Sequence, residues 1–128
     1  MTRVVSFVGH ITTTSIPVEI ATATAVLPDL DVTIASFYDD TAPDECTVPA
    51  VPLRADSRFD VSAFHRLFRL LGRDDVDILH THDNFIGSVG RVLGAAAGVG
   101  IVNTEHRQHD AFTALQNAVN APTMGLAD

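Results

Sequence analysis

Short apolar runs alternate with longer amphipathic segments along this chain, and the alternation limits the folds that the chain can adopt. The apolar runs have the length and β-branched content of buried strands and cover 3–8, 31–38, 76–81 and 100–105. The segments with helical spacing cover 15–29, 60–73, 84–99 and 109–122. A proline-containing run at 47–53 is predicted to form a short edge strand.

This order of elements predicts the architecture. Strands that alternate with helices of such length fold as right-handed βαβ units, with helices on both faces of a parallel sheet. No repeat or linker divides the chain. The sequence therefore predicts an α/β fold, a three-layer Rossmann-like domain with a mainly parallel sheet of about five strands.

Two of the predicted helices carry informative patterns. In the segment 60–73, Asp60 is placed to cap the helix and Gly72 to end it. Its predicted apolar face comprises Val61, Phe64, Leu67, Phe68 and Leu71, and its predicted outward side carries Arg66, Arg69 and Arg73. The segment 84–99 contains Gly87, Gly90 and Gly94. Glycine costs about 1 kcal/mol in a helix interior, so we expect close packing of this helix on the sheet.

Length and composition exclude several classes of protein. The 128 residues correspond to one domain, and no apolar run reaches the ~18 residues of a membrane span. Cys46 is the only cysteine, which excludes an intrachain disulfide and zinc-thiolate clusters. A net charge of −8 argues against a nucleic-acid-binding surface. The N-terminal residues lack the apolar core of a signal peptide, and we expect a cytoplasmic protein.

The charged residues have a further bias. All basic residues are arginine, and the acidic residues are mostly aspartate. This bias is similar to that of proteins from salt-loving archaea, whose acidic surfaces stay hydrated in concentrated salt. A GC-rich genome, which also replaces lysine with arginine, is the alternative source of the bias.

Polar clusters follow three of the predicted strands. Gly9 and His10 follow the first strand, HTHDN (80–84) ends the strand at 76–81, and TEHRQHD (104–110) ends the last. The carboxyl ends of parallel strands meet at one edge of a sheet, where ligands bind. We therefore expect one shared site at this edge, with ordinary polar loops as the alternative.

The histidines differ in their predicted roles. His65 is expected to be exposed, and His80 to be partly buried within its strand. His82 and His106 lie at strand exits, where they suit contact with a substrate hydroxyl or phosphate. His109 is expected only to begin a helix, with Asp110 as the cap.

Three stretches in succession resemble a known family. They are DILHTH (77–82), GRVLGAAAGVGIV (90–102) and NTEH (103–106). In order and spacing they are similar to the N-terminal domain of a glycosyltransferase of family 4. In that family a strand ending like DIIHAH precedes a helix with small residues, an AGVP-like turn and a strand ending T-x-H. The family comprises retaining sugar transferases with two facing Rossmann-like domains, the GT-B architecture. The resemblance covers nearly the whole chain and implies the N-terminal half of a GT-B fold.

The resemblance implies roles for individual residues. His106 matches the family histidine that faces the donor sugar and the acceptor, and is the implied catalytic residue. His82 matches an acceptor-side contact, and Glu19 matches a glutamate that usually follows a Gly-Gly pair beside the donor diphosphate. Ile16 and Pro17 stand at those glycine positions here, and a Cβ and a missing N–H are unsuited to phosphate contact. The predicted substrate-binding residues are Gly9, His10, Glu19, His82, Asp83 and Asn84.

The resemblance also implies partners. A full-length form would bind a nucleotide-sugar donor and a sugar acceptor, without a metal, another cofactor or nucleic acid, and is compatible with peripheral membrane association. The family's donor site lies in a C-terminal domain, which we expect to be absent from 1–128. The chain would then be a partial, acceptor-side domain that is inactive alone. It would be a truncated gene product, a fragment of a longer form, or one half of a split enzyme whose other half is a separate chain.

Two other classes remain open. The pattern H-x-H-D at 80–83 superficially resembles the ligand sets of metal-dependent hydrolases, which need three or four converging ligands. We expect His80 and His82 to point to opposite faces of the sheet, which weakens them as a metal-binding pair. The third class is a non-catalytic Rossmann-like interaction module.

Overall fold

Strands and helices alternate in the structure as the sequence predicts. The computed structural model describes residues 1–12, 16–42, 46–73, 75–82 and 85–104. The elements in chain order are β1 (Thr2–Val8), α1 (Ile16–Ala25), β2 (Leu30–Ser36), β3 (Ala50–Pro52), α2 (Val61–Arg73), β4 (Ile78–His82), α3 (Phe85–Ala97) and β5 (Gly100–Thr104). No helix within these ranges is long and apolar enough to cross a bilayer. The helix predicted at 109–122 lies outside the described residues.

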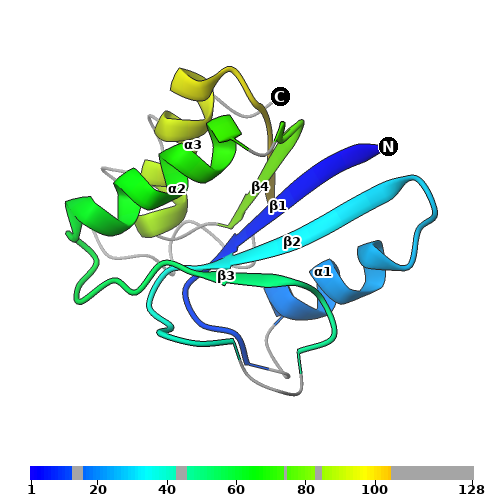
Figure 1. Cartoon of the computed structure of the whole chain (residues 1–128), viewed down its shortest axis with the longest axis horizontal. Coiled ribbons are helices and arrows are strands. Elements are labelled where there is room, and N and C mark those ends of the chain that lie inside the picture. The colour runs from blue at the N-terminus through cyan, green and yellow to red at the C-terminus, as the bar shows by residue number, and fades with distance from the viewer. Residues whose placement is uncertain (13–15, 43–45, 74, 83–84, 105–128) are drawn as a thin grey trace, which may run out of the picture.

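The strands form one sheet in the order β3-β2-β1-β4-β5, and every pairing is parallel. The chain runs from β1 outward to β2 and β3, and then returns to the other side of β1 for β4 and β5 (Figure 1). The predicted edge strand is confirmed as β3, which pairs only with β2 in the described sheet. The direction of the connections thus reverses between β1 and β4, where sheets of this kind place their ligand.

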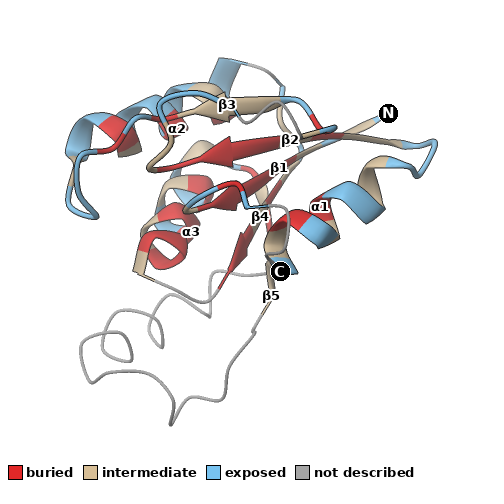
Figure 2. Ribbon diagram, turned by 90° about the horizontal axis from the view of Figure 1, so that it is seen from below, coloured by how far each residue is buried: buried red, intermediate tan, exposed pale blue. Residues whose placement is uncertain are grey.

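Helices cover both faces of the sheet, so the predicted three layers are confirmed. Helix α1 lies on one face, and α2 and α3 lie on the other (Figure 1). The apolar cluster beneath α2 and α3 includes Phe7, Phe37 and Leu67, and the cluster beneath α1 includes Val18 and Ile34. The inner strands are buried, whereas the outer sides of α1 and α2 are exposed (Figure 2). The packing of helices on both faces of this parallel sheet therefore holds the carboxyl ends of the strands at one edge.

Helix α3 lies close on the sheet because two of its glycines face strand side chains. A Cβ at Gly90 would lie 2.8 Å from Cδ2 of Phe7, and one at Gly94 would lie 3.0 Å from Cδ2 of Leu79. A side chain at Gly90 would overlap the phenyl ring unless the helix moved away. The expectation that these glycines serve close packing is confirmed at both positions.

Helix α2 begins as the sequence predicts. Asp60 Oδ1 accepts hydrogen bonds from the backbone N–H groups of Ser62, at 2.9 Å, and Ala63, at 3.3 Å. These bonds satisfy donors that have no partner within the first turn, so the predicted cap is confirmed. The helix continues one residue past Gly72 to Arg73.

The predicted apolar face of α2 was partly wrong. The buried residues are Ala63, Leu67 and Leu71, whereas Val61 is 78% exposed and Phe68 is 38% exposed. The helix packs along the line of the three buried residues, which are four apart, so Val61 and Phe68 lie on the flank of that line. Exposed apolar residues therefore remain on the outer side of α2.

Candidate functional site

The carboxyl ends of β1 and β2 lie beside the start of α3. A Cβ built at Gly9, directly after β1, would lie 3.6 Å from the Tyr38 ring and 3.7 Å from Cδ1 of Ile86. Tyr38 follows β2, and Ile86 is in the first turn of α3. The structure thus brings the loop after β1 next to the segment that follows β4, at the edge where the strand order reverses.

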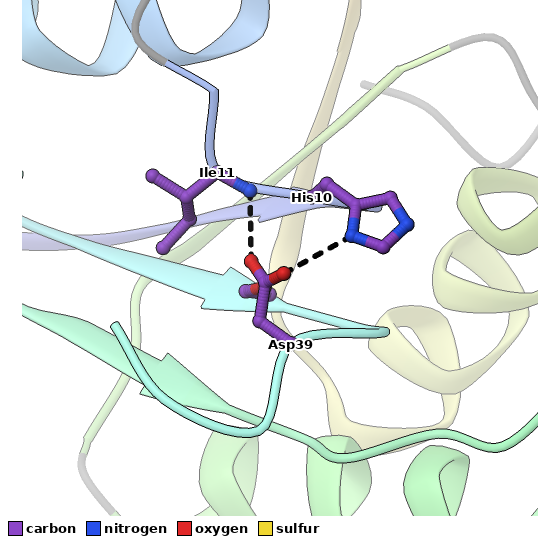
Figure 3. A network of polar contacts seen from close by, with 4 residues as sticks. His10, Ile11 and Asp39 are labelled. Carbon is purple, nitrogen blue, oxygen red and sulfur yellow. Dashed lines mark hydrogen bonds and ion pairs between the residues drawn. The ribbon is translucent and has the colours of Figure 1, made fainter. Parts of the chain in front are cut away.

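Asp39 organises the loop after β1. One carboxylate oxygen, Oδ1, lies 3.0 Å from Nδ1 of His10. The other, Oδ2, accepts a hydrogen bond from the backbone N–H of Ile11, at 2.8 Å (Figure 3). Oδ2 also accepts a hydrogen bond from the hydroxyl of Ser36. The His10 side chain is 61% exposed and the Asp39 side chain 19%. The Asp39 carboxylate, held by the Ile11 N–H and the Ser36 hydroxyl, therefore orients the solvent-exposed imidazole of His10.

The pKa of the Asp39 carboxyl lies below its ordinary value. Burial raises this pKa, but hydrogen bonds from Ser36, from the Ile11 N–H and from His10 together outweigh burial. Because folding lowers the pKa, the carboxylate stabilises the folded state above the unfolded pKa of about 3.9. This stabilisation is lost as the pH falls through the lower folded-state pKa.

Replacement of Asp39 tests this anchoring role. We expect Asp39→Asn to lower the free energy of unfolding by about 1–3 kcal/mol at neutral pH, because an amide cannot replace all three acceptor contacts. The difference from the unchanged protein should shrink as the pH falls from about 4 toward the lower folded-state pKa of Asp39. Urea unfolding at neutral and acid pH measures both effects. The exposed neighbour Asp40 offers a matched control, Asp40→Asn, and equal stability of the two variants at neutral pH would refute the role.

The ring of Tyr38 packs on His10 at this edge. The His10 and Tyr38 rings are stacked, with centroids 5.0 Å apart and an interplanar angle of 26°. Burial raises the pKa of the Tyr38 phenol, and the guanidinium of Arg58 opposes this effect only in part. Tyr38 therefore keeps its proton at neutral pH and can donate a hydrogen bond to a ligand oxygen.

A second aromatic pair lies between the start of α2 and the start of α3. The rings of Phe59 and Phe85 meet edge to face, with centroids 5.2 Å apart. Cζ of Arg58 lies 5.0 Å from the Phe59 centroid and 5.5 Å from the Phe85 centroid. Phe59 is 61% exposed. Phe59 and Phe85 thus give this edge an apolar surface that can contact a ring of a ligand. Arg58 gives it a guanidinium that can bind a phosphate or carboxylate of a ligand.

His80 and His82 lie on the same face of the sheet, with ring centroids 4.7 Å apart. The expectation of opposite faces was wrong, because side chains two residues apart on a strand point the same way. His80 Nε2 lies 2.6 Å from the Thr104 hydroxyl, and its partial burial is confirmed. His82 is only 2% exposed, in contrast to His10. His65 is exposed on α2, as predicted.

Arg91 of α3 connects the carboxyl ends of β4 and β5. Its side chain is fully buried. The guanidinium donates to Asn103 Oδ1 at 2.7 Å, to Ser88 Oγ at 3.0 Å and to Thr81 Oγ1 at 3.5 Å. The contacts join α3 to both strands that lead toward the predicted histidines. Arg91 was not predicted from the sequence, where it reads as one polar residue in a small-residue helix.

Glu19 lies apart from the network around Asp39. It is exposed on α1 and lines an open hollow of about 410 Å³, together with Ile11, Val18 and Cys46. No hydrogen bond within the described residues connects Glu19 to His10 or Asp39. Of the predicted site residues, Gly9 and His10 thus share the edge with Tyr38, Asp39 and Arg58, while Glu19 lies on a neighbouring surface.

The other predicted site residues, Asp83, Asn84 and His106, lie outside the described residues. Over the ranges that the structure describes, no group of three or more His, Cys, Asp or Glu side chains is placed to hold a metal ion. A hydrolase site would therefore need ligands such as Asp83, His106 or His109, which are not among these residues.

Sequence comparison identifies the family. Residues 24–126 match the family model for Glycosyltransferase Family 4. The chain belongs to glycosyltransferase family 4. The matched range includes every element from β2 to β5 and confirms the resemblance seen in 77–110. A search of curated proteins gives no match to this family 4 chain.

Solved structures share the fold of this family 4 chain. S. aureus MnaA, in a co-structure with UDP, superposes with a TM-score of 0.70 at 13% identity, over 100% of this chain and 36% of that protein. A UDP-N-acetylglucosamine 2-epimerase gives a TM-score of 0.61 at 18% identity, over 100% of this chain and 39% of that protein. A putative UDP-N-acetylglucosamine 2-epimerase from Listeria monocytogenes gives a TM-score of 0.66 at 13% identity, over 98% of this chain and 38% of that protein. The likeness confirms the three-layer Rossmann-like fold, and the chain spans less than two fifths of each of these proteins.

Proposed function

We propose that residues 1–128 form the N-terminal, acceptor-side part of a retaining glycosyltransferase with the GT-B architecture. The reaction is transfer of a sugar from a nucleotide-sugar to a lipid, glycan or small-molecule acceptor, without a required metal. Membership of family 4 is the observation that carries this proposal. The polar and aromatic groups at the carboxyl edge of the sheet support it, because sugars present hydroxyl groups and apolar ring faces together.

The edge residues have distinct roles in this proposal. When His10 is neutral and its Nδ1 donates to Asp39, Nε2 carries a free lone pair that accepts a hydrogen bond from a sugar hydroxyl. Tyr38 donates a hydrogen bond to a second oxygen. Arg58 supplies positive charge for a phosphate, and Phe59 supplies the apolar surface beside it. His106, by its match to the family histidine, acts near the reacting carbon.

The donor site is completed by a second Rossmann-like domain in this proposal. The support is the family pattern and the share of the similar structures that this chain covers, which is 36% of S. aureus MnaA. That domain comes either from a longer form of this chain or from a separate chain. It holds the nucleotide, while 1–128 holds the acceptor and closes over the sugar.

Donor binding by the isolated chain tests whether the nucleotide is held by the second domain and not by 1–128. Calorimetric titration with UDP-, GDP- and ADP-sugars should give no binding, or dissociation constants in the millimolar range, because most of the donor contacts are absent. The same titration and a transfer assay are then performed with 1–128 joined to its second domain. Micromolar binding by 1–128 alone would show that it contains the donor site and would overturn the acceptor-side assignment. Tight donor binding without transfer in the joined form would favour the non-catalytic interaction module.

A further inference from the structure

The side chain of His80 contacts the carboxyl ends of both β4 and β5. Its ring lies beside that of His82, the last residue of β4, with centroids 4.7 Å apart. Its Nε2 lies 2.6 Å from the hydroxyl oxygen of Thr104, the last residue of β5. His106 follows Thr104 by two positions. His80 thus touches one residue that matches a family site, and also the residue just before another.

The contact between His80 and Thr104 runs diagonally across the two strands. The backbone register places Val102 opposite His80, and Thr104 opposite His82. A hydrogen bond to a residue farther along the neighbouring strand holds that strand's end in place, because movement of Thr104 away from the ring breaks the bond. Two residues of chain extend at most about 7 Å. The bond that fixes Thr104 therefore also limits where His106 can lie.

The opposite face of the same strands is held by a separate network. Thr81 lies under α3, where its Cγ2 is 3.6 Å from a Cβ built at Gly90. Adjacent side chains on a strand point to opposite faces, so His80 points away from α3. Asn103 Oδ1 accepts hydrogen bonds from Thr81, at 3.0 Å, and from the buried Arg91, at 2.7 Å. This network and the backbone pairing join β4 to β5 without His80, so loss of the His80 contacts should leave the fold intact.

We propose that His80 is a positioning residue for sugar transfer. It holds the ring of His82 and, through Thr104, the chain that leads to His106, so that both strand ends keep a fixed relation to the acceptor. His80 acts through these neighbours, because it is a half-buried residue in the middle of β4. The inference rests on the proposed transferase function, for which it assigns a role to a further residue.

Variants at both ends of the hydrogen bond test the proposal in the form of the enzyme that transfers sugar. Thr104→Val removes only the hydroxyl. It should lower kcat about 10- to 100-fold, the scale of a displaced reacting group, and leave the KM for the acceptor within about twofold. His80→Asn removes the bond and the ring. It should lower kcat by a similar factor and also raise the KM for the acceptor about threefold or more, since His82 loses a ring contact.

Rescue by Gln separates the two contacts of His80. The amide nitrogen of Gln is as many bonds from Cα as Nε2 of His, whereas that of Asn is one bond nearer. His80→Gln should therefore keep the bond to Thr104 and restore kcat to within about threefold, while the KM for the acceptor stays raised.

A double variant tests whether the two residues act through one bond. His80→Asn combined with Thr104→Val should have a kcat no lower than that of His80→Asn alone, because both changes remove the same interaction. A purely structural role would lower the melting temperature of every variant and would not separate kcat from the KM for the acceptor. Thermal melts of all variants measure this alternative.

Ser6→Ala is the matched control. Ser6 lies opposite His80 on β1 and is 1% exposed, and its hydroxyl has no hydrogen-bond partner among the residues that the structure describes. This variant should keep kcat and the KM for the acceptor within about twofold. If the unchanged enzyme transfers sugar and both Thr104→Val and His80→Asn keep kcat within about threefold, the positioning role is overturned and the transferase function stands. If no form that contains 1–128 transfers sugar, the proposed function fails and the positioning role fails with it.

Discussion

Arg91→Ala should lower the free energy of unfolding by about 3–5 kcal/mol, among the largest losses expected for a single change in this domain. The side chain is fully buried and donates to Asn103, Ser88 and Thr81. Its removal leaves a cavity and takes a charged donor from Asn103, Ser88 and Thr81. Asn103 Oδ1 still accepts a hydrogen bond from the Thr81 hydroxyl, and a buried oxygen left without a donor costs about 1–3 kcal/mol. Relaxation of α3 toward the sheet would recover part of this loss.

Urea unfolding of three variants separates the causes of this loss. Arg91→Lys keeps the charge but loses the planar fork, so it should lie between Arg91→Ala and the unchanged protein. Arg69→Ala removes an exposed arginine and should change stability by no more than about 0.5 kcal/mol. If Arg91→Ala and Arg69→Ala unfolded at the same urea concentration, the buried network would have no stabilising role.

The fold could be predicted because it depends on short-range patterns. Apolar runs of strand length, the cap at Asp60 and the prolines near β3 are local signals, and each corresponds to an observed element. The right-handed crossover rule and the alternation of elements then limit the possible topologies, but they do not fix the strand order β3-β2-β1-β4-β5, which was not predicted. The exposure of Val61 and Phe68 was not predictable in the same way, because it depends on which flank of α2 the sheet covers.

The candidate site was only partly predictable, because its contacts join distant segments. His10 was predicted from its place after β1, but its partner Asp39 is 29 residues away and follows a different strand. Phe59 and Phe85 become neighbours only when α2 packs beside α3. Such pairs have no spacing signal in one sequence. The rule that identified His10, that polar residues follow parallel strands, also applies to β2 and would have identified Asp39.

The relation between His80 and His82 needed no structure at all. Residues two apart on a strand share a face, so the sequence alone contradicts the expectation of opposite faces. Their rings lie 4.7 Å apart, and this proximity removes the geometric objection to the pair as metal ligands. A metal site would still need further ligands that converge on the ion, and residues outside the described ranges would have to supply them.

Replacement of His106, the proposed catalytic residue, should have the second of the two largest effects. In a form of the enzyme that transfers sugar, His106→Ala should lower kcat by about 100-fold or more, the usual loss when one positioned polar group near the reacting centre is removed. His82→Ala should mainly raise the KM for the acceptor, since His82 matches an acceptor-side contact. His65→Ala is the control, because His65 is exposed on α2.

Steady-state kinetics with a water-soluble acceptor measure these effects. Donor and acceptor concentrations are varied separately, so that a change in kcat is distinguished from a change in either KM. Calorimetric titration of each variant with the donor, and a thermal melt, show whether a loss of rate comes from the chemical step or from the fold. If all three substitutions lowered kcat equally and by less than about threefold, His106 would have no catalytic role, since one lost transition-state contact costs far more. The histidines at the strand ends would then be ordinary polar residues of their turns.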